Sequence, residues 1–146
     1  MTTYVPDEKG AILAIAGKIN HLHILCTKQF INRDTGEMSI LAVNISSVKD
    51  GIDYDKTCIL HAGEHPYITH DSYVRYKDAV AMRISRILSS IDSGDITVLG
   101  NVSEDVFQRV LMGFEKSPQQ RREGAPDFSH GEESRFKSHV KRNSFF

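Results

Sequence analysis

Short apolar runs separated by turn residues recur along most of the chain. They lie at residues 11–16, 22–27, 38–45, 57–61 and 95–100. Their β-branched and apolar content, with Asp-Thr-Gly and Asp-Gly turn sequences between them, is typical of β-strands. The segment 79–87 is ambiguous. Its apolar residues mostly follow a period of two, which favours a strand that leads into a short helix or turn.

The run at 38–45 is apolar on both of its faces. Ile40, Ala42 and Asn44 share one face, and the residues between them share the other. A strand of this kind runs through the middle of a sheet or barrel, because both of its sides have to be covered.

A helix is predicted after Ser103. This residue is a suitable N-cap, and Glu104 and Asp105 place negative charge in the first turn, where the helix dipole favours it. Apolar residues then recur along one face, at Val106, Val110, Leu111 and Phe114.

Several short strands followed by an amphipathic helix predict a mainly β (α+β) fold, a small β-barrel with a C-terminal helix. The barrel domain is expected to occupy residues 1–117. Residues 118–146 are rich in Ser, Gly, Gln and Pro and hold few large apolar side chains, so a polar tail is predicted that is disordered or orders only on a partner. A tail that orders is expected to form a helix at 132–142.

The composition of the 146 residues, 40% hydrophobic and 25% charged, is ordinary for a soluble protein. No apolar run approaches the roughly 18–20 residues that cross a bilayer, and the N-terminus lacks the layout of a secretory signal. We therefore expect no membrane partner and a cytoplasmic location. In that reducing compartment Cys26 and Cys58 are expected to be buried free thiols.

The net charge of −1 is the sum of two parts of opposite sign. Residues 118–146 carry six basic and four acidic side chains, a net of +2, which leaves −3 for the residues before them. A protein that binds nucleic acid through its overall charge is therefore disfavoured, whereas a local basic patch is compatible with these numbers.

The densest group of functional side chains lies at 61–76, in the sequence His-Ala-Gly-Glu-His-Pro-Tyr-Ile-Thr-His-Asp-Ser-Tyr-Val-Arg-Tyr. Gly63 can adopt positive φ and Pro66 forces the preceding residue toward extended geometry, so a shaped loop is predicted. The loop is expected to enter a helical turn at 71–74, with Asp71 as its cap.

The tyrosines of this block have two interpretations. Tyr67, Tyr73 and Tyr76 can stack on a nucleobase or pack on the barrel as structural residues.

A second group of histidines stands at His21 and His23, which face the same way if they lie on a strand. Together with the histidines of 61–76 they raise the hypothesis of a zinc site, but the spacing matches no zinc signature and no Cys pair supports it. Proton transfer near neutral pH and purely structural roles are the alternatives. We predict no metal and no other cofactor.

Three segments of the chain resemble a group of short bacterial proteins that we associate with PemK/MazF-like toxin components. The segments are His-Leu-His-Ile-Leu-Cys-Thr (21–27), Ser-Ile-Leu-Ala-Val-Asn-Ile (39–45) and the block that starts at Cys58 and ends at Tyr76. The resemblance covers about residues 10–118. It implies a small SH3-like, PemK-like β-barrel with a terminal helix, and an RNA-cleaving toxin of a toxin–antitoxin pair. RNA, an antitoxin protein and a second copy of the chain are the partners that it implies.

The resemblance departs from the family at one place. The Arg-Pro that enters the second strand of MazF-type toxins is absent, and His21 and His23 stand near that position. The catalytic arginine of those toxins therefore has no counterpart here.

Metal-independent RNA cleavage needs a base for the 2′-hydroxyl, an acid for the leaving oxygen and a cation at the phosphate. For this chain we assign proton transfer to His65 or His70, the phosphate contact to Arg75 or Lys28, and a supporting position to His23. The other residues predicted to form the binding surface are His61, Glu64, Tyr67, Ser72, Tyr73 and Tyr76.

A non-catalytic module is the competing hypothesis. In it the same barrel recognises a protein or a nucleic acid, and the His-Pro sequence only shapes a loop.

Overall fold

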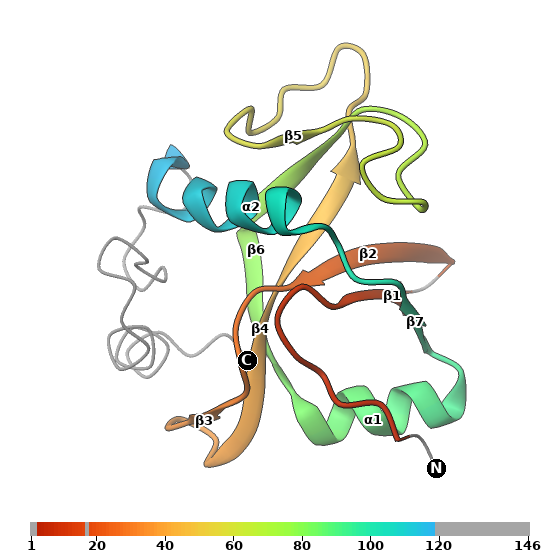
Figure 1. Ribbon diagram of the computed structural model, residues 1–146, viewed down its shortest axis with the longest axis vertical. Helices are drawn as coiled ribbons and strands as arrows, with labels where there is room; N and C mark the ends of the chain where they lie inside the picture. The colour runs from red at the N-terminus through yellow and green to blue at the C-terminus, as the bar shows by residue number, and fades with distance from the viewer. Residues whose placement is uncertain (1–2, 17, 119–146) are drawn as a thin grey trace.

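In the computed structural model, residues 3–16 and 18–118 form a curled antiparallel sheet with two helices (Figure 1). The strands are β1 (Ala11–Ala16), β2 (Ile19–Leu25), β3 (Phe30–Asn32), β4 (Glu37–Ser47), β5 (Ile59–Leu60), β6 (Ser72–Arg83) and β7 (Ile96–Leu99). The helices are α1 (Ile84–Ser93) and α2 (Glu104–Lys116). Apart from residue 118, the predicted tail and its predicted helix at 132–142 lie outside the described residues.

The strand order is β5-β6-β4-β2-β1-β7, and β3 lies beside the first part of β4. All the pairings are antiparallel. Within the described residues no pairing joins β7 to β5, so the sheet curls as a half-barrel. The prediction of a mainly β, α+β fold with a C-terminal helix is confirmed.

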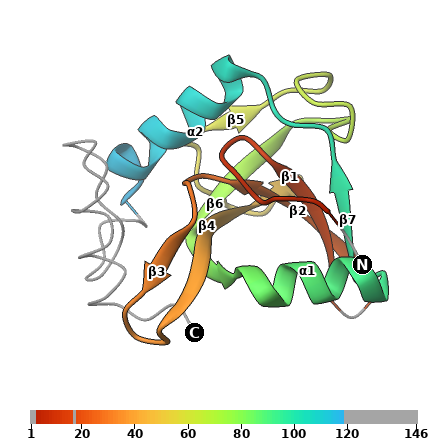
Figure 2. The same ribbon diagram turned by 60° about the horizontal axis from the view of Figure 1, so that its bottom comes forward.

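The two helices cover opposite faces of the sheet (Figure 2). On β4, Leu41 and Val43 pack into a cluster with the apolar face of α2, which we call the α2 cluster. Ile40 and Ala42 face the other way and pack with Ile87 of α1 in the α1 cluster. The prediction of a central strand covered on both sides is therefore confirmed.

Strand β6 differs from the prediction at its start and agrees with it at its end. The helical turn predicted at 71–74 is wrong, because Ser72 begins β6 and pairs with both β4 and β5. Those neighbouring strands supply hydrogen-bond partners that the local sequence does not reveal. The strand-to-helix interpretation of 79–87 is confirmed, since β6 ends at Arg83 and α1 begins at Ile84.

Helix α2 begins as its sequence predicts. The Ser103 side chain accepts a hydrogen bond from the backbone N–H of Val106 at 3.2 Å, and Glu104 and Asp105 occupy the first turn. Lys116 stands in the last turn, where the dipole favours a cation.

The contact between α2 and the sheet centres on Tyr76. Its hydroxyl donates to the Val110 carbonyl at 2.8 Å, and its ring meets that of Phe114 edge-on, with centroids 4.8 Å apart. Gly113 lies against the same hydroxyl, and a Cβ at that position would overlap it. Helix and sheet approach this closely because residue 113 has no side chain.

The end of α2 is tied to the loop before β5. Asp55 is buried, and its carboxylate accepts hydrogen bonds from the Ser117 hydroxyl and from the backbone N–H and hydroxyl of Thr57. A buried carboxylate needs such donors to replace its lost hydration. The chain therefore leaves α2 at a point fixed against this loop.

Cys26 and Cys58 are buried and unpaired, as predicted. Burial raises the pKa of both thiols, so at neutral pH they are protonated and behave as small apolar side chains.

We predict that Gly113→Ala lowers the free energy of unfolding by about 2 kcal/mol, because the added methyl forces α2 away from Tyr76. Gly100→Ala is the control, since a Cβ there meets no atom within 4 Å, and it should change stability by less than about 0.5 kcal/mol. Chemical denaturation measures both. Equal stabilities of the two variants would contradict the packing described here.

Candidate functional site

A cleft of about 790 Å³ opens at one end of the sheet, where β2 begins, β4 ends and β6 begins. The loops that follow β4 and precede β6 form its other walls. Its basic, histidine and tyrosine side chains are His21, Lys49, His70, Arg75, Tyr54, Tyr67 and Tyr73. None of the described residues that line it is Asp or Glu.

His70 is held in the cleft wall by two hydroxyl groups. Its Nε2 lies 2.6 Å from the Ser47 Oγ, and its Nδ1 lies 3.2 Å from the Thr69 Oγ1. Because a hydroxyl can both donate and accept, either ring nitrogen can carry the proton. The imidazole is thus fixed in place in either tautomer.

Arg75 and the aromatic rings occupy the β6 side of the cleft. The Arg75 Nε lies 2.7 Å from the Asp78 Oδ2, and about a third of the arginine side chain is exposed. Tyr73 lies on the same face of β6, and its ring centroid is 5.0 Å from that of Tyr54. Tyr67, in the loop that precedes β6, also lines the cleft and is 42% exposed.

His65 fixes the loop that carries Tyr67. It is 4% exposed, and its Nδ1 accepts a hydrogen bond from the Tyr67 backbone N–H at 3.0 Å. Its Nε2 lies 2.7 Å from the Gly100 carbonyl oxygen, to which it donates. Both ring nitrogens are occupied inside the protein, so this histidine binds the loop to the strand end at β7.

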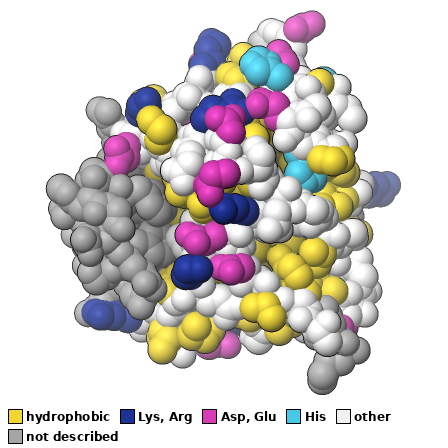
Figure 3. Space-filling view, viewed as in Figure 1, with side chains coloured by type: hydrophobic (Ala, Val, Ile, Leu, Met, Phe, Trp, Pro, Cys, Tyr) yellow, Lys and Arg dark blue, Asp and Glu magenta, His cyan; other side chains and the backbone are white. Residues whose placement is uncertain are grey.

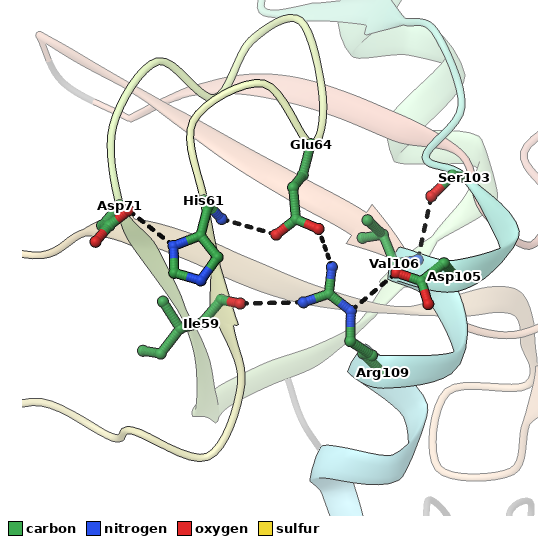
Figure 4. A network of polar contacts seen from close by, with 8 residues as sticks. All are labelled: Ile59, His61, Glu64, Asp71, Ser103, Asp105, Val106 and Arg109. Atoms are coloured by element: carbon green, nitrogen blue, oxygen red, sulfur yellow. Dashed lines mark hydrogen bonds and ion pairs between the residues drawn. The ribbon is translucent and has the colours of Figure 1, made fainter.

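A charged network holds the loop at 61–70 against α2 (Figure 4). The Arg109 guanidinium bonds to the carboxylates of Glu64 and Asp105 and to the carbonyl of Ile59. Glu64 also accepts from the backbone N–H of His61 at 2.8 Å. Burial alone would raise the pKa of Glu64, but these hydrogen bonds and the Arg109 charge outweigh it and lower that pKa.

The outer face of α2 itself carries charges of both signs. Acidic and basic side chains lie interspersed there (Figure 3), and one pair joins Lys9 to Glu104 at 2.8 Å. A mixed surface of this kind does not concentrate a polyanion, in contrast to the carboxylate-free lining of the cleft.

The cleft brings together one part of the predicted site. The predicted residues that line it are His70, Arg75, Tyr67, Ser72 and Tyr73. His23 lies beside it on β2.

The remaining predicted residues lie outside the cleft lining. His65 and Tyr76 are buried, at 4% and 1% exposed. His61 and Glu64 belong to the network with Arg109, where the His61 Nδ1 also lies 3.0 Å from the Asp71 carboxylate. Lys28 pairs with two carboxylates near the N-terminus.

His23 is partly buried, and its Nδ1 lies 3.1 Å from the His21 carbonyl oxygen, to which it donates. Burial is the main reason why its pKa is lowered, and the neighbouring His21 lowers it further, while the hydrogen bond to the carbonyl acts in the opposite direction. The folded protein therefore favours the neutral imidazole.

Three of the basic, histidine and tyrosine side chains in the cleft were not among the predicted site residues. His21 belongs to the histidine pair that the sequence shows, and its place on the cleft-facing side of β2 follows from the strand alternation. Lys49 and Tyr54 lie in the loop after β4, where no local signal marks them. Only the position of that loop beside the start of β6 reveals them.

Within residues 3–16 and 18–118, no group of three or more His, Cys, Asp or Glu side chains is arranged to hold a metal ion. No helix in that part of the chain combines the length and apolar character that spanning a membrane requires. The sequence matches no protein-family model and no curated protein.

We predict that Arg109→Gln loosens the loop at 61–70, because Glu64 and the Ile59 carbonyl lose their charged donor. Amide hydrogen exchange in that loop should become faster by on the order of tenfold. Arg86→Gln, an exposed change on α1, is the control and should leave this loop unchanged. Unaltered exchange in the Arg109 variant would show that the network does not hold the loop.

A pH dependence follows from His23. The unfolded chain protonates this residue below about pH 6.5, whereas the folded protein does so only at lower pH. The unfolded state then binds more protons, so the free energy of unfolding should fall as the pH drops from 7 toward about 5.

His23→Gln should flatten this dependence, and His21→Gln should largely keep it. Denaturation curves at several pH values measure both. If the free energy of unfolding of His23→Gln depends on pH as steeply as that of the wild type, the pH dependence comes from another group.

Proposed function

We propose that the cleft binds single-stranded RNA and that the protein cleaves it. The observation that carries this proposal is the cleft lining: Lys49, Arg75 and two histidines together with three tyrosines, and no carboxylate among the described lining residues. Cationic groups follow a phosphate backbone, and exposed rings stack on unpaired bases.

The aromatic groups favour a single strand over a duplex. Tyr67 is exposed, and Tyr54 and Tyr73 form a tilted pair in the cleft. Bases can stack on such rings only when they are free of their own partners, as in single strands and loops.

Two histidines of the cleft supply the proton transfers. In the proposed reaction one imidazole, of His70 or His21, takes the proton of a 2′-hydroxyl. That oxygen attacks the adjacent phosphorus, and the bond to the 5′-oxygen breaks. The other imidazole, in its protonated form, gives a proton to the leaving oxygen, so that a 2′,3′-cyclic phosphate and a 5′-hydroxyl result.

Arg75 would neutralise the charge that develops on the phosphate. Its guanidinium already forms an ion pair with Asp78, so contact with RNA exchanges one anionic partner for another. His65 and Lys28 were the alternatives for these roles. His70 and Arg75 are preferred because they line the cleft.

The resemblance to PemK/MazF-like toxins supports the same proposal. A curled half-barrel sheet followed by a C-terminal helix is compatible with the SH3-like, PemK-like barrel that the resemblance implies. We therefore propose a toxin-like role, with an antitoxin protein as partner and a homodimer as the assembly.

The test compares RNA binding and RNA cleavage by matched variants. Arg75→Gln should weaken RNA binding by on the order of tenfold, because a charged hydrogen bond to phosphate is lost. His70→Gln should slow cleavage by about 10²–10⁴-fold with little change in binding. Lys28→Gln removes a cation outside the cleft and should leave both quantities unchanged.

The outcomes separate the two hypotheses for this domain. RNA binding in the cleft without cleavage would favour the non-catalytic module. Failure of the wild-type protein to bind any single-stranded RNA would contradict the proposed function.

A further inference from the structure

A row of directly opposed residues crosses the sheet beside the cleft. His23 of β2 pairs with Asn44 of β4, and Asn44 pairs with Arg75 of β6. Opposed residues of antiparallel strands point to the same face. Along that face of β4, Ala42 is buried in the α1 cluster and Ser46 lines the cleft. The row therefore lies where the apolar cluster ends and the polar cleft begins.

Asn44 in the middle of this row is 9% exposed. Its Oδ1 is buried and has no hydrogen-bond partner among the described residues. An unpaired buried acceptor is unfavourable, and an apolar side chain of similar size would avoid that penalty. Stability alone gives no reason for an asparagine at this position.

An irregularity in β6 stands directly beside Asn44. Ala42 pairs with Val80 and Asn44 pairs with Arg75, so two steps along β4 correspond to five steps along β6. The extra residues form a bulge that brings Asp78 to 2.7 Å from Arg75. Bulges next to functional sites serve to redirect side chains in this way. If Arg75 moved from Asp78 to a phosphate of the ligand, the accessibility of the neighbouring Asn44 side chain to that ligand would change.

We propose that Asn44 reads a nucleobase of the bound RNA, with its Oδ1 accepting a hydrogen bond from the exocyclic amino group of adenine or cytosine. This inference rests on the proposed function and specifies the substrate of the same cleft. The Nδ2 of the amide can donate to the ring nitrogen beside that amino group. Uracil held in the same position presents a carbonyl oxygen there and leaves the Oδ1 unpaired, because its one donor, the N3–H, reaches the Oδ1 only if the base is displaced along the cleft.

The test measures base preference apart from cleavage. The probes are homopolymeric 2′-fluoro RNAs of adenine, cytosine or uracil, about eight nucleotides long, which lack the nucleophilic 2′-hydroxyl. Their affinities for the full-length protein are measured by fluorescence anisotropy. The wild type should bind the adenine or the cytosine probe on the order of tenfold more tightly than the uracil probe.

Two variants isolate the role of Asn44. Asn44→Leu should bind all three probes alike, with the wild-type affinity for uracil, and its melting temperature should equal or exceed that of the wild type. Asn20→Leu is the matched control, because Asn20 also lines the cleft but is exposed and lies outside the row. It should keep the base preference.

Each outcome decides the inference. A wild type without base preference, or an Asn44→Leu variant that keeps the preference, would overturn it while the proposed RNA binding stands. A marked fall in the melting temperature of Asn44→Leu would make Asn44 a structural residue and overturn it as well. If none of the probes binds to the wild type, the proposed function fails and the inference fails with it.

Discussion

The fold depends on a central strand whose two faces are both buried over part of its length. Along β4, Leu41 and Val43 require the cover that α2 supplies, and Ile40 and Ala42 require the cover that α1 supplies. Helix α1 covers only one end of the β4 face that carries Ile40 and Ala42. Beyond Ala42 the side chains of that face become polar, and the cleft opens there. The site therefore begins where helical cover of the sheet ends.

Much of the fold could be predicted, because alternation along a strand and capping at a helix are local properties of the sequence. Ser103 caps α2 as its sequence indicates, and the run at 38–45 lies within the central strand. The helical turn expected after Asp71 was wrong because β4 and β5 offer backbone partners to the residues that follow. Such pairings join segments distant in sequence, and a single local pattern does not contain them.

The candidate site was predictable only in part. The His-Pro block does contribute His70, Tyr67 and Arg75 to the cleft. The same block also supplies the residues that hold its loop in place, and a list of residue types does not distinguish the two roles. His65 has the chemistry of a catalyst, but its hydrogen bonds to the Tyr67 N–H and the Gly100 carbonyl make it part of the loop's support. Only the burial of each side chain and its hydrogen-bond partners distinguish residues that line the cleft from residues that support the loop.

The bond between Asp55 and Ser117 has a consequence for the cleft. Asp55 stands next to Tyr54, a wall residue of the cleft, so Ser117 ties the end of α2 to the loop that forms this wall. The same carboxylate accepts two hydrogen bonds from Thr57 within that loop. Loss of this one buried carboxylate would therefore release the helix end and the cleft wall together.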